Sequence, residues 1–387
     1  MSALVALAVL PSLAISLVAG FAMRKLAPRW NLVDPPGDRK IHARVTPYGG
    51  GIAIWAALVL PLVILDLALA IMPDALGTST PDAPQSASWL SQALALLQTH
   101  RGGLLERAGD LWFFLGGATV LMFLGLADDR RKLDWRLRLA VETAVAAAVV
   151  FGRGWTLTLF VNWPLVTAAA SVLWIVWLIN SFNMLDNMDG LSAGVAAISA
   201  CLLAIVMLGT PEPDSGQPQL FVAGFLFLLV GALVGFLFHN RPPARLFMGD
   251  AGAYLVGYCL AVMSILATFT GGGLPRHAIL APLCVFAIPI YDTLSVITIR
   301  LFSGRSPFQG DTSHFSHRLV ALGLSPAQAV LTIYLASAAC GLGALLLHQV
   351  DAWGAAVVLL MIFCLLCVIA TLELTALNQR KNARRSR

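Results

Sequence analysis

The side chains with the greatest chemical potential in this sequence gather in one stretch, NSFNMLDNMDG, at residues 180–190. Its polar residues recur at every third position, as Asn180, Asn183, Asp186 and Asp189, and a fifth, Asn187, lies between the last two. Each step of three residues falls about 60° short of a full helical turn, so they cannot all share one helical face. Asn183, Asp186 and Asn187 can share one. Asp189 suits the N-cap of the next helix, whose N-terminus also favours anionic ligands.

Two adjacent carboxylates, Asp128 and Asp129, end an apolar run and are followed at once by three cations. Adjacent carboxylates repel one another unless a cation neutralises them. Asp128 with Lys132, and Asp134 with Arg138, have the i,i+4 spacing of helix-surface ion pairs. We expect such a pair for Asp134. For Asp128 and Asp129, a metal ion or a phosphorylated ligand is the better explanation.

Two further stretches place polar side chains beside apolar runs. FHNRPPARLFMGDAGAYLVG contains Asn240 and, where the apolar run begins, Asp250. Capping explains an aspartate there, but a third carboxylate site of this kind favours a ligand. SGRSPFQGDTSHFSHRL places His314, His317 and Arg318 on one helical face, at i, i+3 and i+4. Without a third local ligand the two histidines are a weak zinc signal, so we interpret the set as donors to phosphate oxygens.

The loop VDPPGDRKIHARVTPYGG carries Lys40 and Arg44 close to a run of glycines. Cationic side chains where glycines allow close backbone approach suit a phosphorylated ligand or an anionic lipid. Charge that only sets membrane orientation is an equally open interpretation.

The elements that position these side chains are membrane helices. With 58% hydrophobic and 12% charged residues and a mean hydropathy of +0.82, the chain is too apolar for an ordinary soluble domain. A bilayer span needs roughly 20 apolar residues. We expect an all-α polytopic protein with about eleven spans: 3–22, 50–72, 110–127, 138–153, 165–181, 190–208, 219–238, 252–270, 278–301, 327–347 and 353–375.

Most of the Lys and Arg residues fall in alternate loops, which predicts their side of the membrane as cytoplasmic. The N-terminus is then outside, and the C-terminus, with a basic tail at 376–387, is inside. We expect one membrane-embedded domain over 1–387. Its cytoplasmic loops would be the polar stretches, near 33–49, 128–138, 180–190, 239–251 and 303–319. The outside loop from about 73 to 109 ends in a segment, from Trp89, with the spacing of an interfacial helix.

The predicted topology brings carboxylates, amides and cations to one membrane surface. Hard oxygen ligands favour Mg²⁺ or Mn²⁺, and Mg²⁺ binds through one or two carboxylates together with substrate phosphates. Basic donors beside such an ion describe phosphoryl transfer, in which positioning and charge neutralisation supply most of the catalysis.

The five stretches resemble, in order, the cytoplasmic boxes of the polyprenyl-phosphate N-acetylhexosamine-1-phosphate transferase family. They read DRKIHARVTPYGG, LGLADDRRKLDWRLRL, NSFNMLDNMDGLSAG, RPPARLFMGDAGAYLVG and GDTSHFSHRL. The family includes bacterial enzymes that prime O-antigen and teichoic-acid synthesis, and the phospho-MurNAc-pentapeptide translocase. The resemblance runs from about residue 33 to 325, and the family's bacterial members have the same eleven helices.

The resemblance implies transfer of a sugar-1-phosphate, most simply GlcNAc-1-phosphate, from a UDP-N-acetylhexosamine to undecaprenyl phosphate, with release of UMP. It implies a multi-pass protein of the bacterial inner membrane with a cytoplasmic site, Mg²⁺ or Mn²⁺ as cofactor, a homodimer as one oligomeric option, and no nucleic-acid partner. By motif, the metal ligands would be Asp250 and Asn183. The catalytic residues would be Asp128, Asp129, Asp186, His314 and His317. The substrate contacts would be Lys40, Arg44, Asn180, Asn187, Asp189, Asn240 and Arg318.

The His box departs from the family pattern. It reads HFSH, with Ser316 where many members have another histidine, and the triple-His run of the muramyl-pentapeptide branch is absent. By analogy, this favours a small N-acetylhexosamine. A transporter is the main alternative, but transporters place their polar residues near mid-membrane, whereas here they lie in loops and at helix ends.

Overall fold

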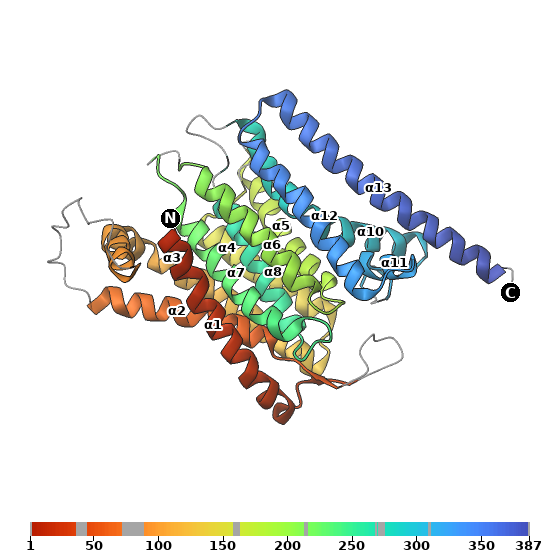
Figure 1. The fold of residues 1–387 in the computed structure, drawn as a ribbon, viewed down its shortest axis with the longest axis horizontal. Coiled ribbons are helices and arrows are strands. Elements are labelled where there is room, and N and C mark those ends of the chain that lie inside the picture. The colour runs from red at the N-terminus through yellow and green to blue at the C-terminus, as the bar shows by residue number, and fades with distance from the viewer. Residues whose placement is uncertain are drawn as a thin grey trace.

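The computed structural model describes residues 2–35, 45–71, 89–157, 163–212, 216–267, 269, 275–308 and 311–385. In these ranges the chain is almost entirely helical (Figure 1). The helices are α1 (Ser2–Leu26), η1 (Ala27–Trp30), α2 (Gly50–Ile71), α3 (Trp89–Arg131), α4 (Trp135–Arg153), α5 (Pro164–Leu185), α6 (Leu191–Gly209), α7 (Leu220–Asn240), α8 (Gly249–Leu266), η3 (Arg276–Leu280), α9 (Ala281–Val285), α10 (Ala287–Phe302), α11 (Phe315–Ala321), α12 (Pro326–Leu347) and α13 (Ala352–Arg385).

The all-α membrane fold is confirmed, and each of the eleven expected spans overlaps one or more of the described helices. Within the described ranges, nine helices are long and apolar enough to cross a membrane. One of the other two expected spans is α4, a helix of 19 residues of which several are charged. The other is a pair of helices, Arg276–Val285 and Ala287–Phe302, that meet at a bend of 65°. The bend has a local cause: Pro289 has no N–H to donate to the carbonyl of Val285, four residues back.

One expected boundary is wrong. The segment from Trp89 is not a separate interfacial helix, because α3 runs unbroken for 43 residues to Arg131. No proline interrupts this stretch, so helical hydrogen bonding continues through it. The last span, Ala352–Glu373, agrees with the expected 353–375, and its helix continues to Arg385 through most of the basic tail.

Helix α8 is the centre of the bundle. It packs against α2, α3, α5, α6 and α7, and 89% of its residues are buried. Small residues allow this: Gly252 of α8 lies against Gly51 of α2, and Gly125 of α3 lies against the backbone of Asp250. By contrast, α13 runs along one edge of the bundle beside α12 (Figure 1), with only 6% of its span buried.

A short hairpin joins the chain between α1 and α2 to the start of α8. Strand β1 (Val33–Asp34) pairs antiparallel with β2 (Thr46–Pro47). Phe247 N–H donates to the Pro47 carbonyl at 2.9 Å, and Gly50 N–H donates to the Phe247 carbonyl at 2.9 Å. The ends of the first polar loop are therefore fixed beside the stretch that carries Asp250. Lys40 and Arg44 themselves lie outside the described residues.

Candidate active site

Asp128, at the end of α3, is held by three donors. Its Oδ2 accepts from Arg138 Nη1 at 2.6 Å and from the Tyr254 hydroxyl at 3.1 Å, and its Oδ1 accepts from Leu133 N–H at 2.6 Å. The side chain is only 3% exposed, and that of Arg138 is 28% exposed. The buried charge of Asp128 is thus balanced by a cation, and the group is fixed in place.

The expected ion pair between Asp134 and Arg138 is wrong. Asp134 is the N-cap of α4, and its carboxylate accepts from Arg136 N–H at 2.7 Å. Since α3 ends at Arg131 and Lys132 takes a left-handed conformation (φ 50°), the chain turns here and brings Arg138 back to Asp128.

Asp129 receives the first N–H groups of α8. Its Oδ1 accepts from Asp250 N–H at 2.9 Å and its Oδ2 from Ala251 N–H at 3.3 Å. These groups have no partners within their own helix, so Asp129 caps α8 from a neighbouring one. Gly249 makes room for it: its φ is +67°, and a Cβ there would lie 2.5 Å from Asp129 Oδ2.

Asp250 lies where α3, α5 and α8 meet. Asn183 Nδ2 donates to its Oδ1 at 2.5 Å, and its carboxyl group also contacts that of Asp128. Asp186 follows directly after α5. Burial raises the pKa of Asp186 to about 8, and the charges of Asp129 and Asp189 add to this shift. We call Asp128, Asp129, Asp186, Asp250 and Asn183 the acid cluster.

The acid cluster fits a hard divalent cation in its chemistry. Carboxylates that crowd together in a buried place favour a cation between them. Among the described residues, no three His, Cys, Asp or Glu side chains converge so as to hold a metal ion unaided. Mg²⁺ does not need this, because it binds through one or two carboxylates plus substrate phosphates. With its Nδ2 turned to Asp250, Asn183 keeps its Oδ1 available as a ligand.

Two predicted substrate contacts are held by the protein itself. Asn180 Nδ2 donates to Glu142 Oε2 of α4 at 2.5 Å, where Glu142 is 1% exposed. Asn240, 3% exposed, accepts from Gly190 N–H at 2.8 Å and donates to the Leu246 carbonyl at 3.0 Å. Asn180 therefore links α5 to α4, and Asn240 fixes the backbone at Gly190 and Leu246. Their contact with a substrate stays a prediction.

Asp189 does not cap α6, contrary to expectation. The N-cap is Gly190, with φ 77°, and no side chain caps the helix. The Asp189 carboxylate instead accepts from Ala244 N–H at 2.9 Å, and the Tyr334 hydroxyl donates to the Gly190 carbonyl at 2.5 Å. The stretch between α5 and α6 is thus tied to the loop after α7 and to α12.

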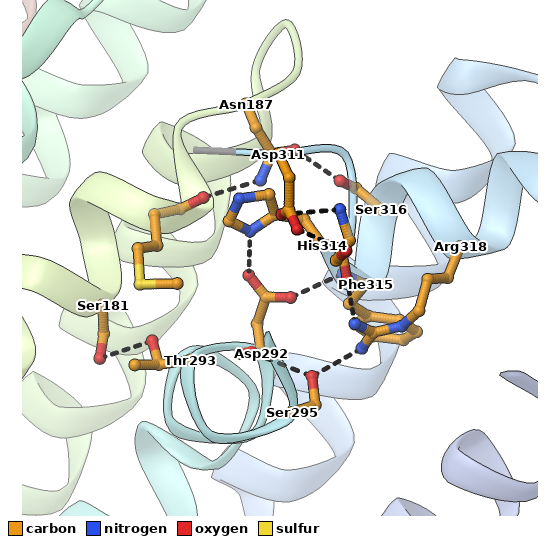
Figure 2. A network of polar contacts seen from close by, with 12 residues as sticks. Ser181, Asn187, Asp292, Thr293, Ser295, Asp311, His314, Phe315, Ser316 and Arg318 are labelled. Atoms are coloured by element: carbon orange, nitrogen blue, oxygen red, sulfur yellow. Dashed lines mark hydrogen bonds and ion pairs between the residues drawn. The ribbon is translucent and has the colours of Figure 1, made fainter. Parts of the chain in front are cut away.

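The His box lies beside the same stretch (Figure 2). Ser316 Oγ donates to Asn187 Oδ1 at 2.5 Å, and Asn187 Nδ2 donates to the Met184 carbonyl at 2.8 Å. His314 is the N-cap residue of α11, and its ring centroid lies 6.2 Å from that of His317. Burial and the neighbouring His314 lower the pKa of His317.

Arg318 turns away from the two histidines. Its Nη2 lies 3.1 Å from Glu373 Oε2 of α13 and 2.7 Å from Ser295 Oγ, and its Nη1 donates to the Ser313 carbonyl. Arg318 and Glu373 have side chains 4% and 6% exposed. The predicted phosphate contact of Arg318 would have to compete with this buried ion pair.

An apolar cavity reaches the same arginine. Its volume is about 520 Å³, and α10 and α13 form most of its walls, with Leu294 and Ile362 among the lining residues. Arg318 and Glu373 also line it. The cavity therefore links the hydrophobic part of the bundle to the His box.

Sequence reasoning missed several residues that organise the site: Glu142, Tyr254, Asp292, Arg300 and Glu373. Glu142, Asp292 and Glu373 are carboxylates inside apolar runs. Because a carboxylate is costly to place there, their positions alone indicated a structural or functional role. Arg300 is bound by Asp311 at 3.0 Å. Hydrogen bonds from Arg300 and Ser313 outweigh the effect of burial and lower the pKa of Asp311.

Comparison with known proteins agrees with this arrangement. The family model described as Glycosyl transferase family 4 matches residues 111–268, which run from the second half of α3 to the end of α8 and include the whole acid cluster. The decaprenyl-phosphate N-acetylglucosaminephosphotransferase of Mycolicibacterium smegmatis is 30% identical over 332 residues, covering 81% of this chain and 74% of that protein.

Two other relatives are similar over still more of the chain. The probable undecaprenyl-phosphate N-acetylglucosaminyl 1-phosphate transferase of Bacillus subtilis is 26% identical over 93% of this chain and 88% of its own length. The undecaprenyl-phosphate alpha-N-acetylglucosaminyl 1-phosphate transferase of Escherichia coli K12 is 28% identical over 89% of this chain and 85% of its own length.

Proposed function

Because this chain belongs to the polyprenyl-phosphate N-acetylhexosamine-1-phosphate transferase family, we propose that it transfers N-acetylglucosamine-1-phosphate from its UDP-linked form to undecaprenyl phosphate. The observation that carries the proposal is the acid cluster, in which carboxylates from α3, α8 and the end of α5 meet beside the His box. The products are UMP and a lipid-linked diphospho-sugar that primes the synthesis of a cell-envelope polysaccharide.

In the reaction, an oxygen of the lipid phosphate attacks the phosphorus that carries the sugar. A new P–O–P bond forms, the bond to the uridine monophosphate oxygen breaks, and UMP leaves with the electron pair. A phosphate monoester is already ionised near neutral pH, so the attack needs little help from a base. Asp128, with its oxygens engaged by Arg138, Tyr254 and Leu133 N–H, is proposed to position the attacking phosphate through the Arg138 cation that it holds.

Asp250 and Asn183 would hold Mg²⁺, which when bound neutralises charge on the diphosphate. Asp129 keeps α8, and with it Asp250, in register with α3. Asp186 and Asp189 are proposed to contact the sugar and the nucleoside. His314 and His317 would donate to phosphate oxygens, since an imidazole N–H is a good donor to them.

A lipid acceptor suits the surroundings of this site. The apolar cavity between α10 and α13 runs from membrane depth to Arg318, and we propose that it takes hydrocarbon of the acceptor. The basic loops support a cytoplasmic position of the acid cluster, at the inner membrane of a bacterium. Transport is less well supported, because the polar residues gather at one end of the helices.

The test is an assay of purified protein with undecaprenyl phosphate, Mg²⁺ and UDP-GlcNAc, in which UMP and the lipid product are both measured. We expect UMP release that stops on chelation and in Asp250→Asn. Asp351→Asn is the matched control, because Asp351 lies in the connection between α12 and α13, where its carboxylate accepts from Gly354 N–H. No UMP release with any UDP-N-acetylhexosamine would overturn the transferase proposal, and activity that survives both chelation and Asp250→Asn would overturn the metal site.

A further inference from the structure

Two arginines and two aromatic rings form a row across α1 and α7, near the ends of these helices that lie toward the acid cluster. Arg24 lies 5.6 Å from the centroid of the Phe21 ring, and Arg241 lies 5.1 Å from that of Phe238. The two rings are 6.0 Å apart. These are the distances of cation–π contacts and of aromatic pairs. Phe21 and Phe238 are 45% and 42% exposed, so the row lies on the outer surface of the bundle.

The two arginines of this row have no counter-ion in the part of the chain that the structure describes. Neither guanidinium forms an ion pair or a side-chain hydrogen bond with a described residue. By contrast, Arg138 and Arg300 hold carboxylates at 2.6 Å and 3.0 Å. The row therefore keeps two positive charges, and their N–H donors, for a ligand that is not part of the chain.

A groove runs from the Arg241 end of the row along the bundle, between α7 and α12. Both helices pack against α6, whose first residues close the groove on the inside. Its volume is about 450 Å³, within the range of ligand sites. Val234 and Phe238 of α7 and Leu331 of α12 line it with exposed apolar side chains. Since α7 and α12 are membrane spans, these side chains face the hydrocarbon of the bilayer, and a ligand can enter from there.

The polar residues of the lining select the charge of the ligand. The Tyr334 hydroxyl is engaged by the Gly190 carbonyl, which leaves Arg241 as the donor for a ligand. Asp189 lines the inner end, where its carboxylate accepts from Ala244 N–H. A phosphate monoester, with a charge of about −1.5 to −2 at pH 7, is repelled by Asp189 more than a phosphodiester with a single charge. A zwitterionic lipid would bring its own ammonium group to the row of arginines.

We propose that this groove binds an anionic phospholipid of the bilayer, with its phosphodiester on Arg241 and an acyl chain between α7 and α12. Arg24, at the other end of the row, adds a second positive charge. Basic pockets between membrane helices bind lipid headgroups in this way, and a guanidinium suits a phosphate. The site is separate from the cavity between α10 and α13. The bound lipid fixes Arg241, the first residue of the connection that leads to Asp250.

The headgroup is tested by native mass spectrometry of the full chain in detergent, titrated with phosphatidylglycerol or with phosphatidylcholine of the same acyl chains. We expect phosphatidylglycerol to bind at least 10-fold more tightly. Arg241→Gln should weaken its binding by about 10- to 100-fold, as loss of a hydrogen bond to a charged group does. The matched control is Arg136→Gln, because Arg136 lies 5.2 Å from the Trp135 ring but does not line the groove. Its binding of phosphatidylglycerol should be unchanged.

The acyl-chain part of the site is tested in the same titration. Leu331→Trp places a larger side chain in the groove and should weaken the binding of phosphatidylglycerol by at least 10-fold. Leu335→Trp is the matched control, because Leu335 is equally exposed to lipid one turn further along α12 but does not line the groove. All four positions are on the surface of the bundle, so each variant should keep the wild-type melting temperature.

Four results would overturn the inference. They are equal Kd values for the two phospholipids, a loss in Arg136→Gln as large as in Arg241→Gln, wild-type binding in both Arg241→Gln and Leu331→Trp, and displacement of phosphatidylglycerol by an equimolar amount of undecaprenyl phosphate. The second would show that only diffuse positive charge attracts the lipid, and the fourth that the groove is a site for the acceptor. None of these measurements needs transferase activity, so a failure of the proposed function would leave them valid.

Discussion

Replacing Gly125 with alanine is expected to push α3 away from α8 and to separate the two sides of the acid cluster. A Cβ at this position would lie 2.3 Å from Ala251 N and 2.4 Å from the backbone carbon of Asp250. Non-bonded carbon contacts are favourable near 3.5 Å, so relief of this overlap needs a shift of about 1 Å. Asp128 and Asp129 follow Gly125 by about one helical turn and would move with α3.

The expected magnitudes follow from this shift. A misplacement of about 1 Å between catalytic groups costs roughly 100-fold in rate. Overpacking of a helix contact costs about 1–3 kcal/mol of stability. Alanine has a better helix propensity than glycine, which offsets up to about 1 kcal/mol of this loss of stability but does not restore the geometry of the site. We therefore expect a larger loss in kcat/KM than in thermal stability.

The measurement is kcat/KM for UMP release together with the melting temperature of the purified protein. Gly116→Ala is the matched control, because Gly116 lies in the same helix and a Cβ there meets no atom within 4 Å. Gly116→Ala brings the same gain in helix propensity without a steric overlap, so its kcat/KM should equal that of the wild type. Wild-type kcat/KM in Gly125→Ala would refute the view that the contact between α3 and α8 sets the geometry of the site.

Three further predictions concern other parts of the site. The folded, ligand-free protein should lose stability as pH rises from about 4 to 8. In this range Asp186, whose pKa is raised from 3.8 to about 8, binds a proton in the folded protein that it has lost in the unfolded chain. The melting temperature of Asp186→Asn should therefore depend less on pH than that of the wild type. Ile362→Trp should fill the cavity and raise KM for undecaprenyl phosphate but not KM for UDP-GlcNAc. The control is Leu360→Trp, at a residue that is 59% exposed, and it should alter neither KM value. Glu373→Gln should lower stability by about 3 kcal/mol, measured by thermal unfolding, since it leaves the buried Arg318 unpaired; an unchanged melting temperature would contradict this.

The sequence predicted the helices well because each span is long and apolar, and hydropathy detects such runs directly. It also singled out five polar stretches as loops of one surface, and hydrogen bonds join four of them: Asp129 to Asp250, Asp189 to Ala244 and Asn187 to Ser316. It could not predict which partners they choose. The i,i+4 rule paired Arg138 with Asp134, but Asp134 is the extended N-cap of α4 and its carboxylate accepts from Arg136 N–H. The turn after Arg131 brings Arg138 to Asp128 instead.

Capping was misassigned for a related physical reason. Asp189 precedes a helix in sequence, but the left-handed Gly190 takes the N-cap position, and Asp189 bonds to Ala244 N–H. Conversely, Asp129 caps a helix that begins 120 residues later. A cap from a distant segment leaves no local pattern, so only the packed helices reveal it.

The ion pair between Arg318 and Glu373 also affects how the protein is made. Membrane helices are inserted as they leave the ribosome, in order from the N-terminus, and α13, which holds Glu373, follows the helix that holds Arg318. Until α13 is in place, the guanidinium of Arg318 lacks the carboxylate of Glu373, and the cavity beside it lacks one wall. A nascent chain that already holds every residue of the acid cluster would therefore still have an unfinished His box, and turnover would begin only after α13 has packed.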